Sequence, residues 1–211
     1  MKRIYSNISL ADRNSFGVVQ QAKSLVEFET AEDLRDYFVE SRPERWYVLG
    51  AGNNTLFTKD YDGVLFTPVC RGRSILASNN EYVDVRAEAA HDWDKLVEWS
   101  VNEGLWGIEN LSAIPSSVGA APVQNIGAYG AEAKDAITVV EYLDTRTLDI
   151  VRLANTECRF AYRESIFKQE LKGHVIILAV EFRLYRSPRP NLGYGDVISE
   201  VENRGGATLR N

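Results

Sequence analysis

The decisive stretch of the sequence reads Ile114-Pro115-Ser116-Ser117-Val118-Gly119-Ala120-Ala121-Pro122-Val123-Gln124-Asn125-Ile126-Gly127-Ala128-Tyr129-Gly130. Few ordinary core elements are this rich in small residues, which leave room beside the backbone for a flat, extended ligand. Its serine, glutamine and asparagine side chains supply neutral hydrogen-bonding groups, and its backbone N–H groups add further donors. Because the run contains no acid or base, we interpret it as a binding surface and not as catalytic machinery. A tight packing site between a helix and a loop is the alternative interpretation.

A second loop of small residues follows an apolar strand expected at Trp46–Leu49 and reads Gly50-Ala51-Gly52-Asn53-Asn54-Thr55. Its glycines permit positive φ and let a ligand approach the backbone closely. Consecutive N–H groups in such a turn bind anions, and pyrophosphate is a suitable guest. The loop departs from both common phosphate motifs, because Thr55 replaces a third glycine and no Lys-Ser/Thr pair follows. Taken alone, the signal is weak, because small residues after a strand more often form just a turn.

The first third of the chain has the pattern of a small parallel βαβ unit. Strands are expected at Leu25–Phe28, Trp46–Leu49 and Val64–Phe66, and Thr30 caps a helix over Ala31–Glu40.

The remainder is typical of an antiparallel α+β unit. We expect strands at Tyr82–Ala87 and Val175–Leu184, a helix over Trp93–Glu103 capped by Asp92, and a hairpin of Ile137–Leu143 with Ile150–Leu153. The sequence thus predicts an α+β fold with one subdomain over residues 1–67 and a second over 68–186. The polar, glycine-rich stretch 187–211 has no obvious element, and we interpret it as the start of a connection to a further domain.

The composition excludes several classes of protein. The 211 residues are 45% hydrophobic and 26% charged, as in globular proteins. The formal net charge of -6 gives no general help in binding nucleic acid or an anionic membrane. No apolar run approaches the roughly 20 residues of a membrane span, and the residues after Met1-Lys2-Arg3 are too polar for a secretory signal. We therefore expect neither a nucleic-acid partner nor a membrane partner.

Cysteine and histidine give no sign of a metal site. Cys70 and Cys158 lack metal-ligand spacing, and two lone packing thiols without an export signal favour a reducing cytoplasm. His91 and His174 lie outside the small-residue loops. We expect structural or surface roles for them, and not covalent attachment of a cofactor.

Several motifs in the same order resemble the UDP-N-acetylenolpyruvoylglucosamine reductases (the MurB type), which reduce a peptidoglycan precursor in bacteria. The stretch quoted first resembles that family's diagnostic segment. Four further segments agree with it: Asn14–Gly17, Leu49–Asn54, Gly107–Leu111 and Cys158–Lys168. Several motifs in register are far more specific than any one of them.

The resemblance implies a vanillyl-alcohol-oxidase/PCMH-type fold of two α+β subdomains with FAD between them. It implies non-covalent FAD, NADPH as hydride donor, and reduction of UDP-N-acetylglucosamine enolpyruvate to UDP-N-acetylmuramate. The FAD-binding residues that it indicates are Gly50, Ala51, Gly52, Asn53, Asn54, Thr55, Pro115, Ser116, Ser117, Gly119, Ala120, Gln124, Asn125, Ile126, Gly127, Ala128, Tyr129 and Gly130.

The same resemblance implies that Arg163 is catalytic, that Tyr162 lies beside the substrate, and that Tyr194 closes over it. A fixed arginine suits this chemistry because it stabilises the negative charge that develops beside the substrate carboxylate. The alternatives are a surface ion pair of Arg163 with Glu164 or Glu157, and a simple turn position for Tyr194.

Two replacements depart from the family pattern. Ser116 stands where glycine is usual and Asn53 where serine is usual. We expect altered local geometry there, and not loss of FAD binding.

The family's proton-donating serine, in a Gly-Ser-Phe-Phe-Lys-Asn-Pro motif, and its assisting glutamate do not occur in the chain. We therefore expect a truncated reductase that is inactive alone. An FAD-binding module without turnover and an oxidase of the same fold are the alternatives; the Tyr162-Arg163 motif argues against the oxidase. Loss of a domain would expose an apolar patch and a sheet edge that favour association, and the oligomeric state is left open.

Overall fold

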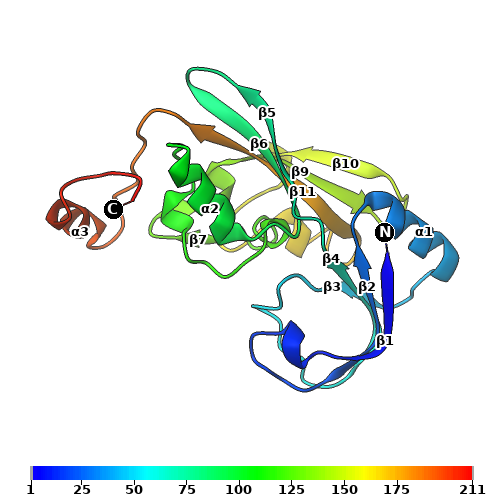
Figure 1. Ribbon diagram of the computed structural model, residues 1–211. Coiled ribbons are helices and arrows are strands. Elements are labelled where there is room, and N and C mark those ends of the chain that lie inside the picture. The colour runs from blue at the N-terminus through cyan, green and yellow to red at the C-terminus, as the bar shows by residue number, and fades with distance from the viewer. Residues whose placement is uncertain (1, 211) are drawn as a thin grey trace.

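The computed structural model describes residues 2–210, which form two large β-sheets, a two-stranded sheet and few helices (Figure 1). The first sheet has the strand order β1-β2-β4-β3. Its strands are β1 (Arg3–Ser9), β2 (Gln21–Phe28), β3 (Trp46–Val48) and β4 (Tyr61–Pro68). Strands β2, β4 and β3 run parallel, as the βαβ pattern predicted, and β1 adds an antiparallel edge that the sequence pattern did not reveal.

Helix α1 (Ala31–Ser41) follows β2 and has the expected capping box, in which Thr30 and Asp33 exchange hydrogen bonds. It buries Leu34, Tyr37 and Phe38. The Phe38 ring stacks on Phe66 of β4 with their centroids 5.1 Å apart. The helix is therefore fixed to the first sheet by aromatic packing.

The second sheet is antiparallel, with the strand order β10-β9-β11-β6-β5. Its strands are β5 (Arg73–Ser78), β6 (Tyr82–Glu88), β9 (Ile137–Asp144), β10 (Ile150–Ala154) and β11 (Val175–Tyr185). The long apolar strand β11 lies at the centre, as its sequence predicts for a buried strand. The two sheets and few helices confirm the α+β prediction.

One face of the second sheet carries most of the hydrophobic core. Helix α2 (Trp93–Asn102) packs there, capped by Asp92 as expected and followed by Gly104 at φ +72. Trp93 is fully buried, and its indole N–H donates to the carbonyl oxygen of Leu111 over 2.8 Å. The segment after α2 covers the rest of this face with short elements: η2 (Glu109–Leu111), η3 (Val118–Ala120), β7 (Gly127–Ala128), β8 (Ala131–Glu132) and η4 (Ala133–Asp135).

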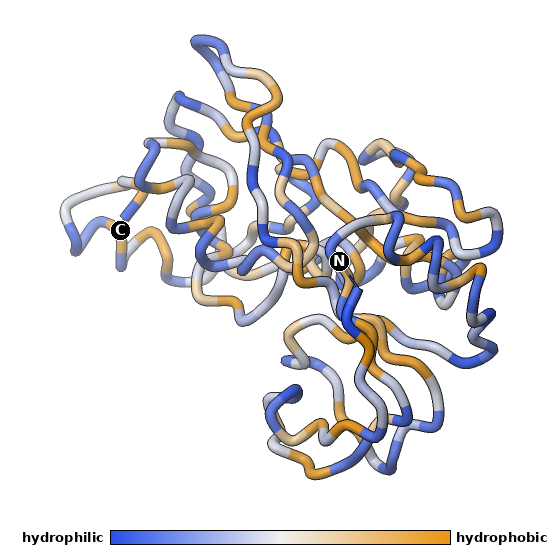
Figure 2. The backbone as a smooth tube through the Cα atoms, turned by 45° about the vertical axis from the view of Figure 1, so that its right-hand side comes forward, coloured by the Kyte–Doolittle hydropathy of each residue, from blue (hydrophilic) through white to orange (hydrophobic). Residues whose placement is uncertain are grey.

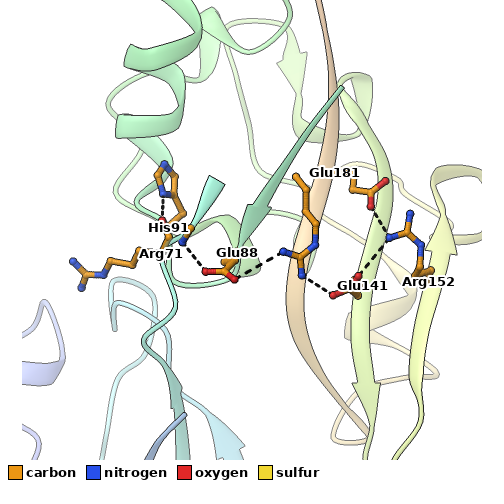
Figure 3. Close-up of polar contacts among 8 residues, drawn as sticks. Arg71, Glu88, His91, Glu141, Arg152 and Glu181 are labelled. Atoms are coloured by element: carbon orange, nitrogen blue, oxygen red, sulfur yellow. Dashed lines mark hydrogen bonds and ion pairs between the residues drawn. The ribbon is translucent and has the colours of Figure 1, made fainter. Parts of the chain in front are cut away.

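The opposite face changes character along the strands. At one end Leu143, Ile176 and Leu178 join the aromatic cluster of the first sheet. Beyond them Figure 3 shows a ladder of alternating charges that runs from Glu88 through Arg86 to Glu141, Arg152 and Glu181. In Figure 2 apolar segments concentrate along the strands and hydrophilic ones in the outer loops. Because Leu143, Ile176 and Leu178 pack against the aromatic residues of the first sheet, the apolar end of this face fixes the two large sheets against each other.

The last segment leaves β11 and forms helix α3 (Val197–Asn203), which lies apart from the sheets in Figure 1. The sequence pattern gave no sign of this helix. The other short helices are η1 (Ala11–Arg13), η5 (Asn155–Glu157) and η6 (Ile166–Lys168). No helix of residues 2–210 has the length and apolarity to span a membrane. The subdomain boundaries at 67 and 186 stay a prediction.

Candidate functional site

A cavity of about 450 Å³ lies between the two sheets. This volume falls in the range of roughly 300–1,000 Å³ that small-molecule sites occupy. The first sheet and the loop that follows β3 contribute Trp46–Val48, Gly50–Thr55 and Pro68. The rest of the lining comes from Ala89, Ile114–Ser117, Gly119, Ala120, Val123, Gln124, Ile126, Phe167, Lys168, Leu171–Gly173, Val175 and Ile177. Both loops that the sequence singled out therefore meet at one cavity.

The loop Gly50–Thr55 lines the cavity along its whole length, directly after β3. Gly52 has φ +72, and a Cβ there would lie 2.1 Å from the carbonyl oxygen of Arg13. Only glycine fits this close approach. The neighbouring Asn14 donates through its side-chain amide to the carbonyl oxygens of Leu10 and Val18. The Asn14–Gly17 motif thus shapes the segment on which the loop rests.

Asn53 and Asn54 connect this loop to the second one. The Asn53 amide donates to the carbonyl oxygen of Pro115 over 2.9 Å, and the Asn54 amide lies 3.4 Å from the side-chain oxygen of Gln124. Gly50 lies close to Ser117, since a Cβ on Gly50 would be 3.3 Å from the Ser117 hydroxyl. The two loops are therefore in direct contact across the cavity.

The first half of the long loop is anchored to the turn that follows β6. The N–H of Gly119 donates to Ala89 over 2.9 Å, and the N–H of Val118 donates to the carbonyl oxygen of His91. A Cβ on Gly119 would lie 2.7 Å from that of Ala89. The His91 ring lies 2.8 Å from the carbonyl oxygen of Arg71, outside the cavity lining (Figure 3). This part of the loop is thus a rigid wall of the cavity.

The second half of the long loop has different partners. Asn125 is fully buried; its amide donates to the carbonyl oxygen of Ala161, and its oxygen accepts the N–H of Lys134, each over 3.0 Å. Gly127 and Ala128 form β7, and Tyr129 and Gly130 form the turn to β8 with positive φ. Among residues 125–130 only Ile126 lines the cavity. The cofactor-binding roles of the other five stay a prediction.

Arg163 lies in a tight turn in which Ala161 and Glu164 exchange backbone hydrogen bonds. Its φ of +54 is a left-handed conformation. Its Nη2 donates to the carbonyl oxygen of Gly127 over 2.9 Å, and Lys168 Nζ donates to the Arg163 carbonyl oxygen over 2.8 Å. The alternative ion pair of Arg163 with Glu164 or Glu157 does not occur among the described residues.

Tyr162 and Tyr194 flank this region in different ways. Tyr162 precedes Arg163 in the turn, with 82% of its surface exposed. Tyr194 packs edge-on against Tyr129 with ring centroids 6.2 Å apart, and it lines an open hollow of about 1150 Å³ beside α2 and α3, not the smaller cavity. The Asn191 amide donates to Gly130 over 2.9 Å and holds the Tyr194 loop in place. Segment 127–130 therefore contacts both the Arg163 turn and the Tyr194 loop.

One wall of the cavity, formed by Phe167, Lys168 and Leu171–Gly173, was not predicted from the sequence. Lys168 lies within the Cys158–Lys168 motif, for which the resemblance implies no role of this lysine, and no motif indicates Lys172. Lys168 and Lys172 are the only charged residues among the described residues that line the cavity. The signal in the sequence was a pair of lysines shortly after the Tyr-Arg motif in an acidic chain.

The sequence profile of the FAD-binding domain matches residues 22–153. The chain belongs to the FAD-binding domain family. It is also 44% identical over 203 residues to the UDP-N-acetylenolpyruvoylglucosamine reductase of Neisseria gonorrhoeae, and 38% identical over 199 residues to that of Flavobacterium johnsoniae. These alignments cover 95% and 94% of this chain and 59% of each relative. The chain thus spans about 59% of the length of these relatives, which confirm the resemblance seen in the motifs.

The fold of this FAD-binding chain matches the crystal structure of the reductase from Thermus caldophilus with a TM-score of 0.71. The match covers 97% of this chain and 70% of that one at 24% sequence identity. It confirms the predicted fold.

The chemistry of the cavity fits FAD. Its described lining has neutral amide and hydroxyl groups, glycine-rich backbone, two ammonium groups and no carboxylate. Such a donor set suits a ligand that carries a pyrophosphate. Neither His91 nor His174 belongs to the described lining of the cavity, so this lining provides no imidazole for covalent attachment of the flavin.

Proposed function

We propose that this chain is the flavin-binding part of a UDP-N-acetylenolpyruvoylglucosamine reductase and that it holds FAD non-covalently in the 450 Å³ cavity. The observation that carries the proposal is the arrangement of the long loop. Its first half lines the cavity, and the carbonyl oxygen of Gly127 in its second half holds Arg163. In this proposal the flavin site and a fixed cation share one segment of the chain.

The residues that would hold FAD are those of the two loops. The backbone of Gly50–Thr55 offers N–H groups to the pyrophosphate, while Pro115–Ser117 and Gln124 offer neutral groups to the rest of the ligand. Bound FAD, reduced by NADPH as co-substrate, would supply a hydride to the enolpyruvyl group of a UDP-sugar.

Arg163 would bind the carboxylate of that enolpyruvyl group. Its Nη2 is engaged by Gly127, and the other N–H groups of the guanidinium have no partner among the described residues. An arginine can grip a carboxylate with two of them and stabilise the charge that develops during reduction. A non-glycine residue in a left-handed conformation costs about 1–3 kcal/mol, so the surrounding contacts must hold it. Gly127 holds the Arg163 side chain and Lys168 holds the Arg163 carbonyl oxygen, each through a hydrogen bond.

Tyr162 and Tyr194 would complete the substrate side. Tyr162 is exposed beside Arg163, and Tyr194 lies on a loop fixed to Gly130 by Asn191. An aromatic ring with a hydroxyl provides both a stacking surface and a hydrogen-bond donor for a sugar nucleotide.

We also propose that this chain alone does not complete the reaction. The proton-donating serine motif and the assisting glutamate are absent from its sequence, so the 211 residues alone would bind FAD without turnover. Cytoplasmic location is also part of the proposal, and the free thiols Cys70 and Cys158 fit it.

The test begins with the absorbance spectrum of the purified chain. We expect a flavin spectrum, or its appearance when the protein is reconstituted with FAD. The enolpyruvyl UDP-sugar should perturb that spectrum in the wild type and not in Arg163→Met. A colourless protein that cannot be reconstituted contradicts the cofactor proposal. An equal perturbation in Arg163→Met contradicts the role of Arg163, and NADPH oxidation that depends on the enolpyruvyl substrate contradicts the lack of turnover.

A further inference from the structure

The wall of the cavity formed by residues 167–173 carries a charge pattern that the proposed function does not use. Lys168 and Lys172 are the only charged members of the described lining, in a chain whose net charge is -6. The described lining therefore offers two ammonium groups and no carboxylate to an anionic ligand.

The ammonium groups of Lys168 and Lys172 differ in their hydrogen bonding. The ammonium of Lys168 donates to the carbonyl oxygen of Arg163 over 2.8 Å. The ammonium of Lys172 has no hydrogen-bond or ion-pair partner among the described residues. Lys168 is thus already part of the Arg163 turn, whereas Lys172 is free to bind a ligand.

The backbone of Lys172 is held in a compact turn between η6 and β11. The N–H of Lys172 donates to Gln169 over 3.1 Å, and the N–H of His174 donates to Leu171 over 3.0 Å. Phe167, at the start of this turn, is buried and packs edge-on against Tyr142 with centroids 5.9 Å apart. The core therefore fixes the base of the side chain, and its flexible four-carbon stem gives the ammonium reach along the cavity wall.

We propose that Lys172 binds a phosphate of the dinucleotide held in this cavity, opposite the backbone N–H groups of Gly50–Thr55. The inference rests on the proposed FAD site. A pyrophosphate carries two negative charges, and neutral N–H groups alone leave them unbalanced. A free ammonium on the wall formed by residues 167–173 supplies a charge-assisted contact that the loop cannot. Riboflavin, which has the same ring system and no phosphate, would gain nothing from Lys172.

The experiment compares FAD with riboflavin in apo-protein titrations followed by flavin fluorescence. The test variant is Lys172→Met, and the matched control is Lys95→Met. Lys95 is an exposed lysine of α2 outside the cavity lining, so both changes remove one positive charge. We expect Lys172→Met to raise the Kd of FAD about tenfold at low salt, as for loss of one partly exposed charge-assisted contact. Lys95→Met should leave it within about twofold.

Three further measurements sharpen the test. The Kd of riboflavin should be unchanged by Lys172→Met. Lys172→Arg should retain FAD affinity, and Lys172→Glu should weaken it more than Lys172→Met does. The difference between wild type and Lys172→Met should shrink at high salt, because added ions screen an exposed charge pair.

The outcomes separate the two proposals. A wild-type protein that binds no FAD contradicts the proposed function itself. If the wild type binds FAD and Lys172→Met behaves like Lys95→Met, the role of Lys172 is refuted while the cofactor site stands. Equal weakening of FAD and riboflavin by Lys172→Met, or no order among the Met, Arg and Glu variants, likewise overturns the phosphate contact.

Discussion

The side-chain amide of Asn53 donates a 2.9 Å hydrogen bond to the carbonyl oxygen of Pro115 and so joins the two loops that line the cavity. Asn53 lies in the loop after β3 of the first sheet, and Pro115 lies in the segment after α2 that packs on the second sheet. The contact joins these two parts of the chain at the place where we propose that FAD binds.

Replacing Asn53 with alanine should loosen this connection and weaken FAD binding. A neutral hydrogen bond contributes about 1 kcal/mol, so we expect the Kd of FAD to rise roughly fivefold, measured by fluorescence titration. Ser15→Ala is the control, because Ser15 is the other side chain that bonds to Asn53 and it does not line the cavity. An equal effect of both substitutions would show that the Pro115 contact has no special role.

Gly52→Ala should destabilise the protein far more than Gly104→Ala does. Both glycines have φ +72, so alanine meets the same backbone strain at each position, about 1 kcal/mol. A Cβ at Gly52 would lie 2.1 Å from the Arg13 carbonyl oxygen, whereas one at Gly104 would meet no atom within 4 Å. We expect about 3 kcal/mol or more of lost unfolding free energy at Gly52, measured by urea denaturation. Equal losses would refute the close approach.

Asn125→Ala should cost about 2–3 kcal/mol of unfolding free energy. The substitution leaves the carbonyl oxygen of Ala161 and the N–H of Lys134 without the partner that the buried amide provides. Hydrogen exchange of the turn at residues 161–164 should also become faster. Gln124→Ala, at the neighbouring and less engaged position, should cost less than about 1 kcal/mol. A change of similar size at both positions would count against the bridging role of Asn125.

Arg152→Met should destabilise the charged ladder shown in Figure 3. Arg152 lies 2.6 Å from Glu181, whose side chain is only 8% exposed. Arg152 itself is about half exposed, so its removal leaves the buried Glu181 carboxylate unbalanced at a cost of about 1–2 kcal/mol. The double variant Arg152→Met/Glu181→Leu should recover most of that loss in urea denaturation. A double variant less stable than Arg152→Met would overturn this expectation.

Asp144→Asn should reduce stability near neutral pH and have less effect in acid. The hydrogen bond from the Arg146 guanidinium holds the pKa of the Asp144 carboxyl below its ordinary value. A pKa lowered by folding gives stability that is present above the ordinary value of about 3.9 and is lost as the pH falls through the folded value. The difference in unfolding free energy between wild type and Asp144→Asn should therefore shrink below pH 4. A difference that stays the same down to about pH 3 would contradict this expectation.

Local signals predicted much of the fold. The caps at Thr30 and Asp92 placed both long helices correctly, and the apolar run from Val175 placed the central strand. Of the strands in the two large sheets, β1 and β5 were not predicted, and both lie at sheet edges. Every residue of β5 is exposed, so neither burial nor alternation marks it in the sequence. An edge strand is specified by the neighbour with which it pairs, and this information is not local.

The candidate site was predicted as a set of residues, but not in its arrangement. The sequence presents Pro115–Gly130 as one uniform run of small residues, and the structure divides it between the cavity wall and the support of the Arg163 turn. The division depends on bonds such as that from Asn125 to Ala161, between positions 36 residues apart. The wall that contains Lys172 was missed for the same reason, because its distance from the loops is set by the packing of η6 and β11.

The short segment between Gln124 and Gly127 limits where residues can be inserted into or deleted from this chain. Gln124 lines the cavity and Gly127 holds Arg163, with only Asn125 and Ile126 between them. An inserted or deleted residue here would shift the Arg163 guanidinium relative to the cavity, because two intervening residues are too few to compensate for the change in length. Surface loops usually tolerate insertions and deletions. We expect the turn at Gly104 to tolerate them, because no atom lies within 4 Å of a Cβ built there. Among related sequences we expect gaps near Gly104 and none between Gln124 and Gly127.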